Sequence, residues 1–349
     1  MNKTMHLISN AHLDPIWQWE WEEGCASAVA TFRCAARFCR EFDNYIFCHN
    51  EALIYRWVEE YDPALFREIR ELVRLGKWHI MGGWHVQPDC NMPSGEAFVR
   101  QITEGRRYFR EKFGVEPTTA INFDPFGHTR GLVQILAGTG YDSYIFCRPH
   151  EGLCHLPAET FRWVGYDGSS VIAQRAQTGY STALGNAMKK IRPTTEALTD
   201  AAPLGFCLWG VGNHGGGPSR EDIRAINAFM EEAKAEGVTV LHSTPEAYFA
   251  DVRAEAAAGT RVLPEHHGDL TAWAQGCYTS QVLIKQKYRQ TENSLFSAEK
   301  AVSHAVLLGL MEYPEKEFGE ALYDLLTVQF HDVLPGTSLQ PAEEGALRM

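Results

Sequence analysis

The chain has 349 residues, of which 45% are hydrophobic and 22% charged, and its formal net charge is −12 at pH 7. This length suits one large α/β domain and a smaller second one, with the composition of an ordinary soluble protein. The excess of acidic residues excludes nucleic acid and anionic membrane as main partners. No stretch approaches the ~18 apolar residues of a membrane span, and none has the pattern of a secretory signal.

Short apolar runs alternate with amphipathic segments over about the first 250 residues. This alternation is typical of a parallel sheet covered by helices. The expected strands, in chain order, are residues 5–9, 45–48, 78–81, 119–123, 143–147, 171–173, 205–210 and 238–242.

Two helices in this region have recognisable start signals. Asp62 and Pro63 offer an N-cap and a first helical residue, and the apolar stripe that follows ends at Gly76. Ser219, with Asp222 three residues later in a capping-box position, opens a second helix that ends at Gly237. We expect Asp222 to be a cap rather than a catalytic residue.

The amino-acid composition changes at residues 250–259, which are Ala-rich and polar. One long helix is expected over about 280–311, and another after Pro314 toward His331. We therefore predict an α/β fold with a parallel, distorted (β/α)-barrel-like catalytic domain over residues 1–250. A helical-bundle segment over residues 251–349 is expected to follow it.

Nine cysteines are scattered singly, with no Cys-x-x-Cys pair. This distribution excludes zinc-ribbon and thioredoxin spacings, and it indicates reduced thiols in a cytoplasmic protein. Self-association is left open.

Polar side chains recur where the predicted strands end, which is where parallel α/β sheets place ligand sites. They are His12 and Asp14, Asp124 in Asp-Pro-Phe-Gly-His, Arg148, His214 in a Gly-rich loop, and His331 with Asp332 at the end of the last helix.

Each of these groups also has a structural explanation. Asp124 before a proline can serve its own turn, and His331 can interact with the dipole at a helix end. The glycine run at 215–217 lacks a following Lys-Ser/Thr, which favours a turn over a phosphate cradle. Glu51 is a single carboxylate without a distinguishing neighbour.

Taken together, however, two His and two Asp form a nitrogen and oxygen ligand set suited to zinc. A carboxylate able to attack an anomeric carbon would then make a retaining glycosidase.

Three segments resemble glycoside hydrolase family 38, the zinc-dependent α-mannosidases. They are His-x-Asp-Pro-x-Trp at 12–17, Asp-Pro-Phe-Gly-His at 124–128 and His-Asp-x-x-x-Gly-Thr at 331–337, in the family's order. Stretches at 82–96 and 278–281 resemble the bacterial and cytosolic branch of the family. The resemblance extends from about residue 5 to the C-terminus.

The resemblance implies a retaining α-mannosidase that acts on mannose-containing oligosaccharides through a covalent mannosyl intermediate. One zinc ion is expected on His12, Asp14, Asp124 and His331, with Asp124 also the nucleophile. Trp17 is expected to stack under the sugar, Arg148 to keep Asp124 ionised, and Asp332 to bind sugar hydroxyls.

Two departures from the family pattern leave an alternative open. Asn213 occupies the place of the Asp expected to be the general acid/base, which leaves His214 as the titratable group of that loop. The β-rich domains of the family are also expected to be absent, with an incomplete helical bundle. The alternative is an inert zinc- and mannoside-binding remnant. A metal-dependent polysaccharide deacetylase ranks last, because the sequence lacks a His-x-x-x-His pair.

Overall fold

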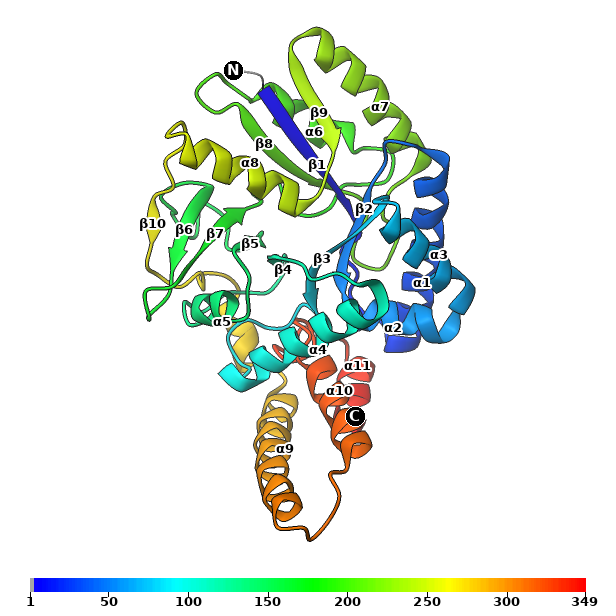
Figure 1. Ribbon diagram of the computed structural model, residues 1–349, viewed down its shortest axis with the longest axis vertical. Helices are drawn as coiled ribbons and strands as arrows, with labels where there is room; N and C mark the ends of the chain where they lie inside the picture. The colour runs from blue at the N-terminus through cyan, green and yellow to red at the C-terminus, as the bar shows by residue number, and fades with distance from the viewer. Residues whose placement is uncertain (1–2) are drawn as a thin grey trace.

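The computed structural model describes residues 3–349 and has an α/β architecture (Figure 1). All eight predicted strands are confirmed. The strands are β1 (Lys3–Asn10), β2 (Phe47–Glu51), β3 (Trp78–Trp84), β4 (Thr119–Asn122), β5 (Ser143–Phe146), β6 (Thr160–Val164), β7 (Ser170–Arg175), β8 (Leu204–Trp209), β9 (Val238–His242) and β10 (Glu265–His266).

The strands form two five-stranded sheets. The first has the order β3-β2-β1-β8, with β9 also paired to β1, and all its pairs are parallel. The second has the order β10-β6-β7-β5-β4, and within it β6 runs antiparallel to β7. Strands β6 and β10 are additions to the predicted set, so the second sheet is mixed where a parallel one was expected.

Two of the helices that cover these sheets begin at the caps predicted from the sequence. Asp62 accepts a hydrogen bond from the amide of Leu65 at the start of α3, and Ser219 accepts one from Asp222 at the start of α7, as predicted. The helices are α1 (Trp21–Glu41), α2 (Ala52–Tyr61), α3 (Pro63–Arg74), α4 (Gly95–Phe113), α5 (Leu132–Gly138), α6 (Met188–Glu196), α7 (Arg220–Ala235), α8 (Pro245–Ala257), the 3-10 helix η1 (Gln275–Thr279), α9 (Val282–Leu307), α10 (Glu315–Val328) and α11 (Gln340–Arg348).

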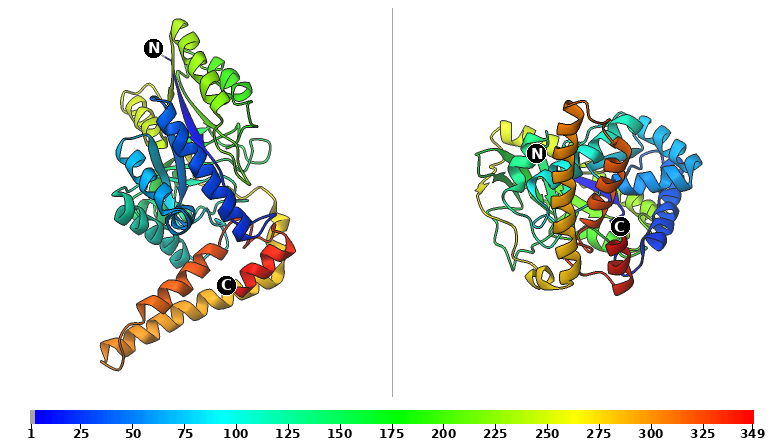
Figure 2. Two further views of the ribbon diagram at one scale, coloured as in Figure 1. Left: turned by 90° about the vertical axis from the view of Figure 1, so that its right-hand side faces the viewer. Right: turned by 90° about the horizontal axis from the view of Figure 1, so that it is seen from below.

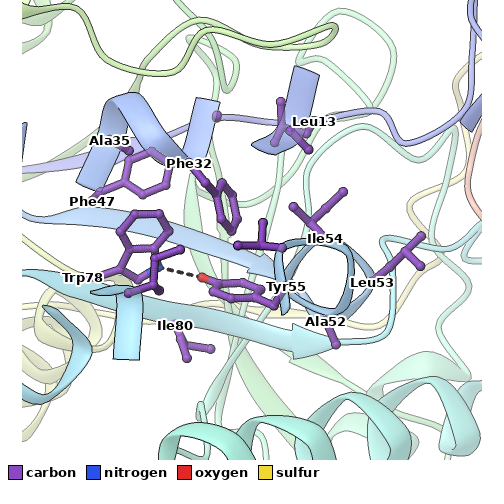
Figure 3. Packing of buried hydrophobic residues seen from close by; sticks show 14 of the residues in the cluster. Leu13, Phe32, Ala35, Phe47, Ala52, Leu53, Ile54, Tyr55, Trp78 and Ile80 are labelled. Atoms are coloured by element: carbon purple, nitrogen blue, oxygen red, sulfur yellow. Dashed lines mark hydrogen bonds between the residues drawn. The ribbon is translucent and has the colours of Figure 1, made fainter. Parts of the chain in front are cut away.

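The largest hydrophobic cluster lies between the first sheet and helices α1, α2 and α3 (Figure 3). Phe32 is fully buried there, in edge-to-face contact with Phe47, Tyr55 and Trp78. The Trp78 indole nitrogen donates to the Tyr55 hydroxyl at 2.8 Å, which satisfies a polar group inside an apolar region.

Helices α9 and α10 extend together away from the α/β part (Figure 2). The predicted long helix is confirmed, but its buried residues lie only near its start, at Ile284, Tyr288 and Glu292. At the far end, Leu307 is 82% exposed and Leu310 is 74% exposed.

No helix in residues 3–349 is long and apolar enough to cross a membrane. The domain division at residues 250 and 251 stays a prediction.

Truncation of Phe32 tests the main core. We expect Phe32→Ala to lower the free energy of unfolding by about 3–5 kcal/mol, because it leaves a cavity among rigid aromatic rings. The measurement is urea denaturation, with Leu310→Ala as the control, which should shift stability by less than about 0.5 kcal/mol. Equal effects of the two variants would contradict this picture of the core.

Candidate active site

The carboxyl ends of β1 and β8 approach each other closely enough to fix the loops that follow them. Gly210 has φ 124°, and a Cβ there would lie 1.9 Å from the carbonyl oxygen of Asn10. Just beyond this point, the amide of Asp14 donates to the carbonyl of Asn213 at 2.9 Å. Because Gly210 has no side chain, the two loops can lie against each other. His12 and Asp14 are buried there at 1% and 3% exposure.

Four of the predicted residues converge here from three different places in the sequence. His12 Nε2 lies 2.9 Å from Asp14 Oδ1, and His331 Nε2 lies 3.7 Å from the same oxygen. Ligand atoms of His12, Asp124 and His331 lie within 4.8 Å of one another, as do those of Asp14, His331 and Asp332. The two groups share His331, so they describe one site.

The atoms that face one another in this site lack hydrogen-bond partners. His12 Nε2, Asp14 Oδ1 and His331 Nε2 are all buried and all unpaired. Buried polar atoms without partners are costly, and three that point at one another indicate room for a shared cation. Two imidazole nitrogens and two carboxylates are the donors that zinc takes in proteins, so the residues present fit this metal.

Burial controls the protonation of the site. It lowers the pKa of both His12 and His331, which keeps their imidazoles neutral and able to bind a metal. Burial, with a further contribution from the nearby Asp124 carboxylate, raises the pKa of Asp14 well above its ordinary value. Burial also raises the pKa of Asp332 to about 6.

Arg148 is placed where it can neutralise Asp124. It follows β5, its Nε donates to Asp124 Oδ1, and its guanidinium lies 4.8 Å from the centre of the Trp273 ring. The ion pair is largely shielded, since the side chains are 23% and 14% exposed. Arg148 therefore holds the Asp124 carboxylate in a fixed direction.

Two predicted residues lie outside this buried group. The imidazole of His214 is 50% exposed and binds Glu23 Oε1 at 2.8 Å. Trp17 is half-buried, with its ring edge-to-face against Trp19, and its carbonyl accepts from the amide of Leu339. The glycine run at 215–217 forms the predicted turn, closed by two bonds between Val211 and Gly217 at 2.8 Å.

Sequence reasoning missed three residues beside the site. Glu51 ends β2, is fully buried, and lies near enough to His12 and Asp14 for both to affect its pKa, contrary to the expectation of an isolated carboxylate. Gln87 follows β3 and contacts both histidines. The ring of Tyr180 lies 4.3 Å from that of His12. The strand-end rule that found the other residues could have found Glu51 and Gln87, whereas Tyr180 carries no sequence signal.

Two family profiles together match almost the whole chain. The "Glycosyl hydrolases family 38 N-terminal domain" profile matches residues 2–276, and the "Alpha mannosidase middle domain" profile matches residues 272–348. The chain is 27% identical to "Alpha-mannosidase G" of Dictyostelium discoideum, covering 98% of this chain and 31% of that protein. It is 26% identical to "Alpha-mannosidase" of Saccharomyces cerevisiae, covering 95% and 32%.

Among solved structures, the chain resembles an alpha-mannosidase from Enterococcus faecalis V583, with a TM-score of 0.83 and 20% identity. That match covers 99% of this chain and 40% of the other, and it confirms the α/β fold. The chain thus spans about a third of the length of the curated relatives it matches.

Glu51 predicts a measurable pH dependence of stability. Burial raises its pKa from 4.5 to about 7, so the folded chain holds a proton that the unfolded chain has lost. The free energy of unfolding should therefore fall as pH rises from about 4.5 to about 7, by about 3 kcal/mol from this group.

Urea denaturation of the metal-free chain, with a chelator present, measures this effect. Glu51→Gln should remove that part of the pH dependence, whereas the exposed control Glu312→Gln should leave it unchanged. A Glu51→Gln profile parallel to that of the unaltered chain would show that Glu51 does not hold the proton.

Proposed function

The chain belongs to glycoside hydrolase family 38, and from this premise we propose that it contains the catalytic region of a retaining α-mannosidase. The whole relatives are about three times as long, so activity, substrate and partners are proposals for this chain. The proposed substrates are the terminal α-mannosyl linkages of mannose-containing oligosaccharides.

The observation that carries the proposal is the set of buried, unpaired atoms on His12, Asp14 and His331. With Asp124, these residues would hold one zinc ion. A bound zinc would supply positive charge for the hydroxyl groups of a sugar. That charge would also offset the burial and the nearby Asp124 carboxylate, which together raise the pKa of Asp14.

Asp124 is the proposed nucleophile. Its carboxylate would attack the anomeric carbon as the bond to the leaving oxygen breaks, giving a mannosyl ester that water then hydrolyses. Arg148 would orient the attacking carboxylate through their ion pair. Trp17 and Asp332 are proposed to bind the sugar, by stacking and by accepting hydroxyl hydrogen bonds.

The leaving oxygen needs a proton donor. His214 is the sequence candidate, and its imidazole would have to leave Glu23 to reach the site. Tyr180 is a second candidate, because its ring lies against His12 and its hydroxyl donates to Asn213 Oδ1 at 3.1 Å. Burial raises the pKa of Tyr180, which keeps the phenol protonated.

The second candidate function is an inert zinc- and mannoside-binding remnant. Asn213 favours it, because an amide cannot donate a proton as a carboxylic acid does.

A cytoplasmic location is proposed as well, since all nine cysteines are free.

A covalent adduct on Asp124 would distinguish the enzyme from the remnant. With an activated α-mannoside, acid quenching during the first turnover should leave one mannosyl unit on the peptide that contains Asp124, detectable by mass spectrometry. Asp124→Asn should form no adduct and should lower turnover by about 10³-fold or more. The exposed control Asp200→Asn should behave like the unaltered chain. Sugar binding without any adduct would favour the remnant.

Metal analysis tests the proposed ligands directly. The purified chain should hold about one equivalent of zinc, and His12→Ala and His331→Ala should each lose it. His155→Ala should keep it, because that side chain is 83% exposed. Less than about half an equivalent in the folded, zinc-treated chain would refute the ligand set.

A further inference from the structure

Gln87 is the one described residue that hydrogen-bonds both candidate histidine ligands. It is fully buried in the segment that follows β3. Its amide nitrogen on the main chain donates to Glu51 Oε1 at 2.8 Å, and its side-chain oxygen accepts from the amide of Phe123 at 2.7 Å. Phe123 immediately precedes Asp124, so Gln87 contacts the end of β2 and the segments that follow β1, β4 and α10.

The main-chain carbonyl of Gln87 fixes the tautomer of His331. His331 Nδ1 lies 2.8 Å from this carbonyl oxygen, which can only accept a hydrogen bond. The proton of the neutral imidazole is therefore on Nδ1, and the lone pair of Nε2 faces the site. This is the arrangement that a histidine metal ligand needs.

The side chain of Gln87 has the opposite effect on His12. Because the Phe123 amide can only donate, it fixes the amide oxygen of Gln87 on its own side. The amide nitrogen of Gln87 then donates to His12 Nδ1 at 3.1 Å. His12 must accept at Nδ1, and its proton lies on Nε2, 2.9 Å from Asp14 Oδ1.

We propose that Gln87 is a positioning residue that holds His12 with its proton on Nε2 and thereby weakens the binding of a metal ion at this site. The inference rests on the proposed zinc site. A cation at Nε2 requires the proton to move to Nδ1, where it meets the amide NH2 of Gln87. If that amide turns over, its NH2 meets the N–H of Phe123 instead, so one buried donor loses its acceptor in either orientation.

A carboxylate at position 87 would remove this conflict. Its two oxygens could accept from Phe123 and from His12 Nδ1 together, which leaves Nε2 free for the metal. Gln87→Glu is therefore expected to bind zinc more tightly, by about 10–100-fold.

The first test needs no zinc. Long-range ¹H–¹⁵N spectra of the metal-free chain, labelled at histidine, report which ring nitrogen carries the proton. The signals are assigned by their loss in His12→Gln and His331→Gln. We expect the proton on Nε2 in His12 and on Nδ1 in His331, and Gln87→Glu should move the His12 proton to Nδ1. A His12 proton already on Nδ1 in the unaltered chain would overturn the inference.

The second test compares zinc affinities by competition with a chromophoric chelator. Asn122→Asp is the matched control, since Asn122 is fully buried at the end of β4, its side chain has no hydrogen-bond partner, and the change adds the same charge. Gln87→Glu should exceed this control by about 10-fold or more. If both variants bind zinc more tightly by the same factor, the added charge alone explains the effect, and the inference fails. Expected tautomers in a chain that binds no zinc would refute the zinc site while supporting the control of His12 by Gln87.

Discussion

The desolvation of Asp14 is the constraint on which the site depends. Its carboxylate is 3% exposed, and its Oδ1 faces imidazole nitrogens without making a hydrogen bond. A buried carboxylate in this condition must be protonated or must be paired with positive charge. Arg148 is the fixed cation close by, and it is already paired with Asp124. With Asp14 ionised, the site as a whole carries more negative than positive charge, which favours a cation.

The fold tolerates this cost because the candidate ligands come from rigid elements. His12 and Asp14 follow β1, Asp124 follows β4, and the segments behind them belong to large apolar clusters. Gly210 has no side chain, which lets the loops after β1 and β8 lie against each other. Preorganised ligands do not have to be ordered when a cation arrives, so more of the binding energy remains available.

The strands and the motif residues were predictable because each has a local signature. Apolar runs marked the strands, and the strand-end rule placed His12, Asp14 and Asp124 on one edge of the fold. The antiparallel β6 was missed although Asp167-Gly168 between β6 and β7 is a hairpin signal. Tyr180 belongs to the site through contacts made at long sequence separation, with the ring of His12 and with Asn213. Pattern and spacing do not encode such contacts.

The position of His331 has a consequence for the helices that follow the α/β part. This candidate ligand follows α10 and is held by the carbonyl of Gln87, to which His331 Nδ1 donates, next to a bridge between Pro88 and Phe330. A cation bound by His331 and His12 together would bind more tightly to the docked arrangement than to one in which α10 has moved away. By thermodynamic linkage, if docking of α10 strengthens ion binding by a given factor, the bound ion strengthens the docking of α10 by the same factor. The ion would therefore stabilise the contact between the sheets and α10, and its loss would weaken that contact.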